Sequence, residues 1–195
     1  FAFGTGDFTI ATRFRTKGNG TLVSKCPPTG KWEPDSKAVF LRDGLLVYDI
    51  GWVGQMDTEQ RYNDGKWHRV LLTHHDRAAR MYVDGALVAK QDDFVCEDQS
   101  SHVFKIGAAS SDFGGDYSGD ISDVTVWQHN VPDGKAQQWT RGEVVNMGEE
   151  SLVWSPDEDT ANAADRNDEE HDQKVRGPIR LQADNAEVRF ANIWE

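Results

Sequence analysis

Short apolar segments separated by turn-forming pairs are the feature that most constrains how this 195-residue chain folds. In the first segment, residues 8–15, Phe8, Ile10, Thr12 and Phe14 alternate with positions that we expect to face water. A period of two is typical of a strand with one face in a core and the other in solvent. The chain therefore predicts a half-buried β-strand close to its start.

Turn signals recur every ten residues or so, which favours antiparallel strands. Asp43-Gly44 and Asp84-Gly85 each join two apolar runs, and this dipeptide accepts the positive φ angles of a tight hairpin. No amphipathic helix of useful length separates the runs, which argues against a parallel α/β fold. We expect an all-β fold, a two-sheet antiparallel β-sandwich, with one short helix at 133–142. The expected strands are 8–15, 21–24, 38–42, 45–50, 70–74, 79–83, 86–95, 103–106 and 117–127.

The negative charge of the chain is concentrated in one segment. The net charge is −12, and residues 155–173 hold eight acidic residues against one arginine. An acidic surface repels phosphates, and no apolar run approaches the ~20 residues of a membrane span, so we expect neither a nucleic-acid partner nor membrane insertion. We divide the chain into a sandwich at 1–150, an acidic loop or linker at 151–174, and a C-terminal β-hairpin at 175–195 packing on the sandwich edge. A weak cation site is the alternative interpretation of the acidic run.

Three segments carry a family resemblance: Gly6 to Ile10, Asp64 to Val70 and Gly119 to Trp127. In this order and spacing they resemble the framework of laminin G-like domains, and are similar to pentraxins and to concanavalin A-type jelly rolls. The resemblance implies a recognition module of a secreted, multidomain bacterial protein, in an extracellular or periplasmic location, with neighbouring domains of the parent protein among its partners. It also implies Ca²⁺ as a cofactor, because such domains bind it on loops through hard oxygen ligands. The candidate ligands are Asp7, Asp116 and Asp120, and turn-forming aspartates are the alternative interpretation.

The end of the chain carries a second resemblance. Residues 177–182 and 187–194 look like the closing hairpin of the 3-keto-disaccharide hydrolase family, with Asp184-Asn185 as the turn. The remainder of that family's pattern is missing. The match suggests a parent protein that handles sugars.

Cys26 and Cys96 lie 70 positions apart, and neither belongs to a Cys-x-x-Cys pair. This spacing excludes a zinc knuckle and a thioredoxin-type redox motif. Two buried free thiols are one interpretation. The resemblance to extracellular modules favours the other, a disulfide between Cys26 and Cys96.

The sequence offers little support for catalysis. The Glu-x-Asp-x-x-Glu pattern of jelly-roll glucanases is absent, and in an unbroken strand Asp120 and Asp123 face opposite sides. A bulge near Ser122 would place them on one side. His74 and His75 are adjacent on a strand, so we expect them on opposite faces, and no serine lies in a nucleophile elbow. We expect no catalytic residue.

Carbohydrate recognition needs flat aromatic faces and a few fixed polar groups, and the chain has seven tryptophans. Trp32 lies in a proline-rich loop and Trp52 follows an apolar run, so both are candidates for one exposed rim. Tyr48, Asp49, Gln55 and Arg61 are candidates to add hydrogen bonds there. The sequence predicts a non-catalytic, lectin-like glycan-binding module. The alternatives are part of a glycoside-processing hydrolase, and a protein-interaction or spacer domain.

Overall fold

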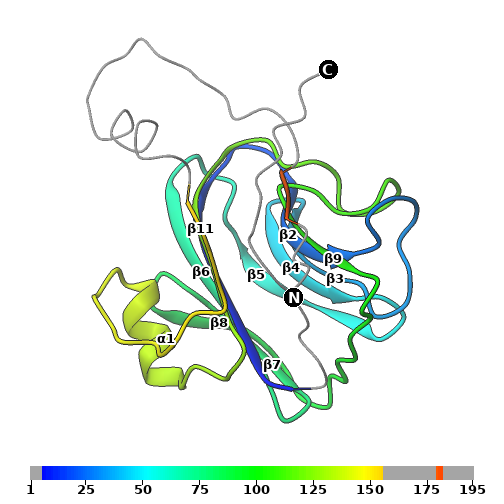
Figure 1. Cartoon of the computed structure of the whole chain (residues 1–195). Coiled ribbons are helices and arrows are strands. Elements are labelled where there is room, and N and C mark those ends of the chain that lie inside the picture. Colours follow the sequence, from blue (N-terminus) through cyan, green and yellow to red (C-terminus); the bar gives the residue numbers. More distant parts are fainter. Residues whose placement is uncertain (1–5, 156–178, 182–195) are drawn as a thin grey trace.

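Two six-stranded antiparallel sheets form the protein, and they pack face to face (Figure 1). The computed structural model describes residues 6–155 and 179–181. In spatial order, sheet A consists of β11 (Leu152–Trp154), β10 (Asp120–Trp127), β1 (Phe8–Arg15), β6 (Trp67–His75), β7 (Ala78–Val83) and β8 (Ala86–Gln91). Sheet B consists of β12 (Ile179–Leu181), β9 (Val103–Ile106), β2 (Gly20–Cys26), β3 (Lys37–Arg42), β4 (Leu45–Ile50) and β5 (Gly54–Arg61). The prediction of an all-β, two-sheet sandwich is confirmed.

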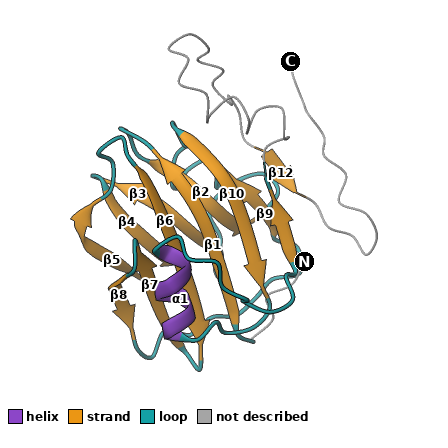
Figure 2. Cartoon of the chain, turned by 90° about the vertical axis from the view of Figure 1, so that its left-hand side faces the viewer, coloured by secondary structure: helices purple, strands orange, loops and turns teal. Residues whose placement is uncertain are grey.

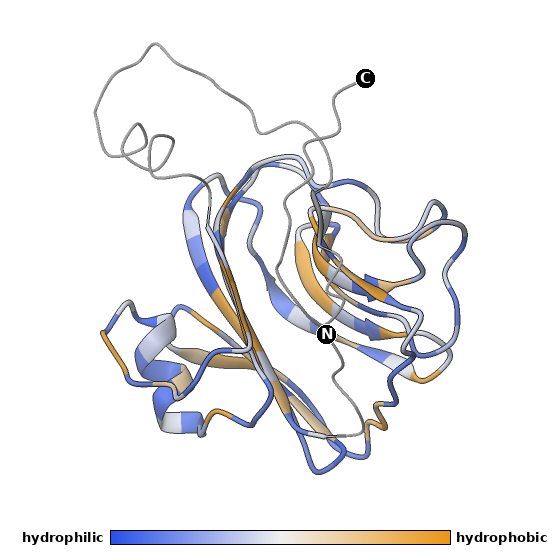
Figure 3. Cartoon of the chain, in the orientation of Figure 1, coloured by the Kyte–Doolittle hydropathy of each residue, from blue (hydrophilic) through white to orange (hydrophobic). Residues whose placement is uncertain are grey.

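The main core fills the space between the sheets. Alternate residues of β1 enter it as the sequence predicts, with Phe8, Ile10 and Phe14 buried against side chains of sheet B. Apolar segments run along strands of both sheets (Figure 3). Both Asp-Gly pairs form the expected hairpins, since Asp43, Gly44, Asp84 and Gly85 all have positive φ.

A second, smaller core lies on the outer face of sheet A. Helix α1 (Asp133–Thr140) lies against this face, as both views of the chain show (Figures 1 and 2). The expectation that the alternate positions of β1 face water is therefore wrong for Thr9 and Ala11, which are fully buried. Helix α1 and its flanking loops replace solvent over these two residues. The cluster consists of Ala11, Leu71, Tyr82, Trp127, Val131, Ala136 and Met147.

The pairing of β1 with β10 contains the bulge that the sequence suggests. Arg13 pairs with Asp123, and the next residue, Phe14, pairs with Ile121, so Ser122 is left unpaired. The bulge places Asp120 and Asp123 opposite Arg15 and Arg13 on one face. The Asp120 carboxylate accepts a hydrogen bond of 2.8 Å from Arg15. These two carboxylates are thus placed beside arginines instead of facing one another across a cleft.

Sequence reasoning missed two strands. Strand β11 pairs with β10 in sheet A, although it lies in the segment 151–174 that the sequence predicts as a loop or linker. The other missed strand is β5. Its residues are mostly polar, and only Met56 and Thr58 are buried. An edge strand needs just one buried face, so two buried residues in eight are sufficient here. Strand β8 also ends four residues before the predicted position, at Gln91.

The predicted disulfide between Cys26 and Cys96 is absent, because both residues are buried free cysteines. Cys26 and Ser24 point to the same face of β2, with their side chains 3.6 Å apart. Cys96 belongs to the core on the other face of sheet B. The two thiols therefore lie on opposite sides of one sheet.

Near the C-terminus, the described residues are those of β12, which pairs antiparallel with β9. The rest of the predicted hairpin at 175–195, and the acidic segment from residue 156 onward, lie outside the described residues. Within the described part of the chain, no helix has the length and apolar character needed to cross a membrane.

Candidate functional site

The outer face of sheet B carries the side chains best arranged to bind a ligand. Residues that pair directly across neighbouring strands point to the same face, so the register defines two rows of side chains. The first row is Lys105, Ser24, Ala38, Asp49 and Gln55. The second row is Thr21, Phe40, Val47 and Asp57. Together with Arg42, we call these residues the sheet B face.

Two loops cover the β2–β3 part of this face. Trp32 stacks on Phe113, and both pack against the buried residues Ala38, Phe40 and Val47. The Asp112 carboxylate accepts a hydrogen bond of 2.7 Å from the Trp32 backbone N–H, which lowers the pKa of Asp112. Trp32 is therefore half-buried and held in one orientation, while the β4–β5 part of the face is left open to solvent.

Asp49 is the half-buried acid on the open part of the face. Burial raises the pKa of this carboxyl to about 6, and the neighbouring Asp57 acts in the same direction. The Arg42 guanidinium and a hydrogen bond from Trp32 act in the opposite direction. Perturbed carboxyl groups of this kind are common at binding sites.

Beyond Asp49, the face ends at a rim formed by the β4–β5 turn. Trp52 lies in this turn with positive φ, and 74% of its surface is exposed. The next paired residue is Gln55, which is exposed and donates hydrogen bonds of 3.0 Å to Asp57. A Cβ at Gly51 would lie 3.0 Å from the Trp32 indole nitrogen, so both tryptophans lie at this rim. The structure thus brings together four of the six predicted ligand-binding residues, Trp32, Asp49, Gln55 and Trp52.

The other two predicted residues do not belong to the site. Tyr48 is 1% exposed and belongs to the main core, because residues 48 and 49 point to opposite faces of β4. Arg61 pairs with Leu45, four residues along β4 from the partner of Gln55, so it lies about 13 Å from Gln55 and away from the rim. Their places are taken by Arg42 and Asp57, whose side chains approach to 3.8 Å, and by Phe113. Alternation along β3 puts Arg42 on the same side as Ala38 and Phe40, and this pattern could have identified Arg42 from the sequence. Phe113 could have been identified as an aromatic residue among polar and glycine residues in a loop.

The three predicted calcium ligands are not brought together. Asp7 precedes β1, whereas Asp120 pairs with Arg15 at the other end of that strand, roughly 25 Å away. Asp116 lies against Gly20 at the start of β2. These residues do not form a common calcium site, because the β1–β10 ladder separates Asp7 from Asp120.

Comparisons with known proteins place this architecture among lectin-type folds. The sialidase module CBM40 of Ruminococcus gnavus superposes with a TM-score of 0.57 at 15% identity, over 71% of this chain and 84% of its own. A pentraxin of Limulus polyphemus superposes with a TM-score of 0.55 at 15% identity, over 80% of this chain and 81% of its own. At these identities the likeness concerns the fold alone.

In sequence, human laminin subunit alpha-3 is 37% identical over 51 residues. This stretch spans 25% of the present chain and 2% of the laminin subunit. The family model of the concanavalin A-like lectin/glucanases superfamily matches residues 2–134. Since this match covers more than half of the chain, the protein belongs to the concanavalin A-like lectin/glucanases superfamily.

Proposed function

We propose that the sheet B face and its rim bind a glycan without catalysis. The observation that carries this proposal is the row Ala38, Asp49 and Gln55, which runs between the Trp32–Phe113 stack and the exposed Trp52. Trp52 offers an apolar ring for stacking on a sugar, while Asp49 and Gln55 offer acceptors and donors for its hydroxyl groups. A fold likeness to a module solved with α2,3-sialyllactose is consistent with this use of the scaffold.

The charges of the face favour a neutral sugar. The Arg42 guanidinium is already paired with Asp57, which leaves the Asp49 carboxylate as the charge beside Gln55. The whole chain also carries a net charge of −12. A sialylated or sulfated glycan would be repelled by this field. We therefore expect neutral glycans to bind more tightly than their sialylated forms.

The context of the domain is part of the same proposal. We infer that it is a module of a secreted, multidomain bacterial protein, acting outside the cell or in the periplasm beside other domains. The match to a short stretch of the much longer laminin subunit supports a modular origin.

A glycan array on the full chain tests the proposal, with lactose and sialyllactose among the sugars. The glycan retained best is then titrated calorimetrically against the parent and Trp52→Ala. We expect Trp52→Ala to weaken binding about tenfold, in line with one lost aromatic contact, at an unchanged melting temperature because Trp52 is exposed.

Leu87→Ala is the matched control, since Leu87 is an exposed apolar residue on β8 of the other sheet. It should leave binding unchanged. An array without hits, or equal affinity in the parent and Trp52→Ala, contradicts the proposal.

A further inference from the structure

At the end of the sandwich away from Asp120, His75 lies between two carboxylates. Its Nδ1 is 2.7 Å from Asp7 Oδ2, and its Nε2 is 3.2 Å from Asp76 Oδ2. One ligand atom from each of the three residues lies within 4.8 Å of the other two. Imidazole and carboxylate are ligands that divalent transition metals share.

The sandwich itself positions these groups. Phe8 pairs with His74, so the antiparallel register brings Asp7 next to His75. Asp76 and Arg77 form the two-residue turn between β6 and β7, both with positive φ. This turn follows His75 directly and keeps the Asp76 carboxylate beside its ring. All three residues are therefore held by the β1–β6–β7 ladder.

A second histidine in the same sheet shows that flanking carboxylates alone are not sufficient. His68 Nδ1 lies 2.7 Å from Asp84 and its Nε2 lies 3.1 Å from Asp64. Yet Asp64, His68 and Asp84 do not place one ligand atom each within 4.8 Å of the other two. Among the described residues, Asp7, His75 and Asp76 meet this condition. His68 is a buried histidine held by two hydrogen bonds, whereas the acids around His75 converge.

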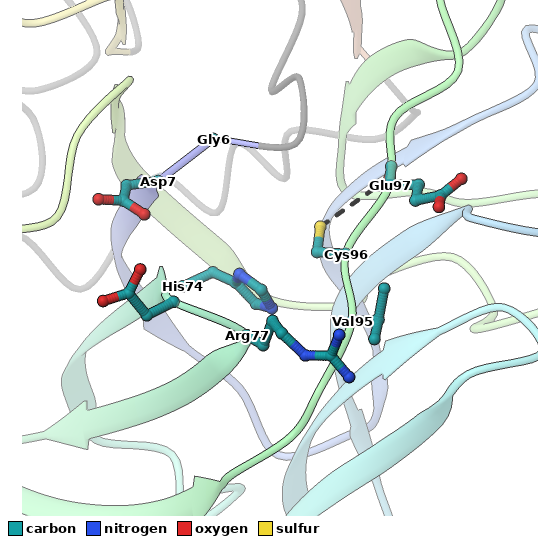
Figure 4. A pocket seen from close by; sticks show the side chains of 8 residues that line it. Gly6, Asp7, His74, Arg77, Val95, Cys96 and Glu97 are labelled. Atoms are coloured by element: carbon teal, nitrogen blue, oxygen red, sulfur yellow. Dashed lines mark hydrogen bonds between the residues drawn. The ribbon is translucent and has the colours of Figure 1, made fainter.

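A cavity of about 260 Å³ lies beside His74 at this end of β6, and His75 does not line it (Figure 4). Asp7 and Asp76 line it together with His74, Arg77, Cys96 and Glu97. His74 is on the opposite face of β6 from His75, as the sequence predicts, and its Nε2 lies 2.7 Å from the Phe94 carbonyl oxygen. Its ring is therefore already engaged. The cavity therefore lies on the His74 side of β6, and the open side of the converging group is the solvent-exposed side of His75 and Asp76.

We propose that Asp7, His75 and Asp76 form a binding site for a divalent transition-metal ion of the zinc class. One imidazole and two carboxylates supply three ligands, and all three side chains reach solvent, so water can complete the coordination. The imidazole distinguishes this site from a calcium site, because Ca²⁺ takes oxygen ligands. Each ring nitrogen of His75 faces one of the two carboxylates. The nitrogen that does not bind the ion can therefore donate a hydrogen bond to the second oxygen of the carboxylate beside it, and such a hydrogen bond orients a metal-bound histidine.

Calorimetric titration of the full chain with ZnCl₂ at neutral pH, in a buffer that does not bind zinc, tests this proposal. We expect one zinc ion per chain, and a loss of affinity of about tenfold or more in His75→Gln and in Asp76→Asn. Both residues are at the surface end of β6, so the variants should fold, which the far-ultraviolet circular dichroism spectrum checks. In parallel, zinc should shift the imidazole NMR resonances of His75, and the same concentration of CaCl₂ should not.

Asp64→Asn is the matched control, because it removes a carboxylate beside His68 instead of His75. It should change zinc affinity by less than about twofold, as expected for a group outside the site. A Kd weaker than about 1 mM in the parent overturns the proposal, since no specific site then exists. Parent-like zinc affinity in both His75→Gln and Asp76→Asn also overturns it, because the ion is then bound elsewhere.

Discussion

Trp32 lies almost flat on Phe113, with the ring centroids 3.9 Å apart and the ring planes 11° apart. Phe113 in turn meets Phe40 edge-on, at 5.2 Å between centroids. The Ser111 backbone N–H donates to the Gly30 carbonyl oxygen, so the two loops are also joined through their backbones. Two loops distant in sequence thus form one wall of the candidate glycan site.

Phe113→Leu should lower both stability and glycan affinity. Leucine keeps apolar volume but removes the stack, so we expect a loss of about 1 kcal/mol in the free energy of unfolding. Urea denaturation measures this loss, and calorimetry with the glycan selected on the array measures binding. Unchanged glycan affinity in this variant would show that the wall does not contact the ligand.

Asp49→Asn should stabilise the protein at neutral pH. The pKa of Asp49 is raised from 3.8 to about 6 in the folded state, mainly by burial. Between these two values the folded chain holds a proton that the unfolded chain has released, so stability falls as pH rises through this window. Asparagine does not ionise. We expect the variant to be more stable than the parent by about 1 to 2 kcal/mol at pH 7, and equally stable below about pH 4.

Urea denaturation at several pH values follows this difference. Asparagine retains an oxygen that can accept the hydrogen bond from Trp32, so the comparison isolates the charge. A stability difference that stays constant between about pH 4 and pH 7 would contradict the assigned pKa shift.

Asp98→Asn should be strongly destabilising. Asp98 accepts a hydrogen bond of 2.6 Å from Lys25 and lies 3.7 Å from the Lys37 ammonium group, and all three side chains are buried. Burial lowers the pKa of Lys25, and Asp98 acts in the opposite direction. Removing the carboxylate leaves buried ammonium charges uncompensated, at a cost of about 3 to 5 kcal/mol.

Denaturation by urea gives this value, and Asp93→Asn is the control. Asp93 pairs with Arg77 at an exposed site, where a lost ion pair costs about 1 kcal/mol or less. Equal effects of the two substitutions would show that the cluster around Asp98 is hydrated.

Arg77→Gly should stabilise the β6–β7 hairpin. Arg77 has a φ of 62°, whereas the corresponding residues of the other two Asp-containing hairpins are Gly44 and Gly85. Relief of the left-handed conformation gains about 1 to 2 kcal/mol, and the greater freedom of the unfolded chain removes part of it. We expect a net gain of about 0.5 to 1 kcal/mol, measured as a higher urea midpoint.

Gly44→Ala should act in the opposite direction. Its φ is 80°, and a Cβ there would lie 2.4 Å from the Asn63 side-chain oxygen. A less stable Arg77→Gly variant would mean that contacts of the arginine side chain outweigh the backbone strain.

The two cysteines should react with thiol reagents readily only after unfolding. Both are buried, and burial raises the pKa of Cys96 to about 11. At pH 8 the reactive thiolate of Cys96 is therefore scarce in the native protein, and burial shields both side chains from the reagent. Ellman's reagent should detect two thiols per chain in denaturant and react slowly with the native chain. Absence of both thiols in denaturant without reductant would show that a disulfide forms.

Much of the fold was predictable because its signals are local. Alternation along residues 8–15 and the Asp-Gly pairs indicate strands and tight turns through the chain's own stereochemistry. The polar strand β5 escaped this reasoning because a strand at a sheet edge needs few apolar residues. The cover that helix α1 provides for Thr9 and Ala11 depends on segments more than a hundred residues away.

For the candidate site, the amino-acid sequence determined which residues share a side of a strand, and tertiary structure decided which side is the core. Parity separates Tyr48 from Asp49, but only the packing of sheet B against sheet A buries the tyrosine and leaves the aspartate on the open face. Likewise, Asp7 and His75 become neighbours through the β1–β6 register, since pairing between distant strands is set by the whole sandwich. Local stereochemistry fixes alternation, whereas burial is a property of the assembled layers.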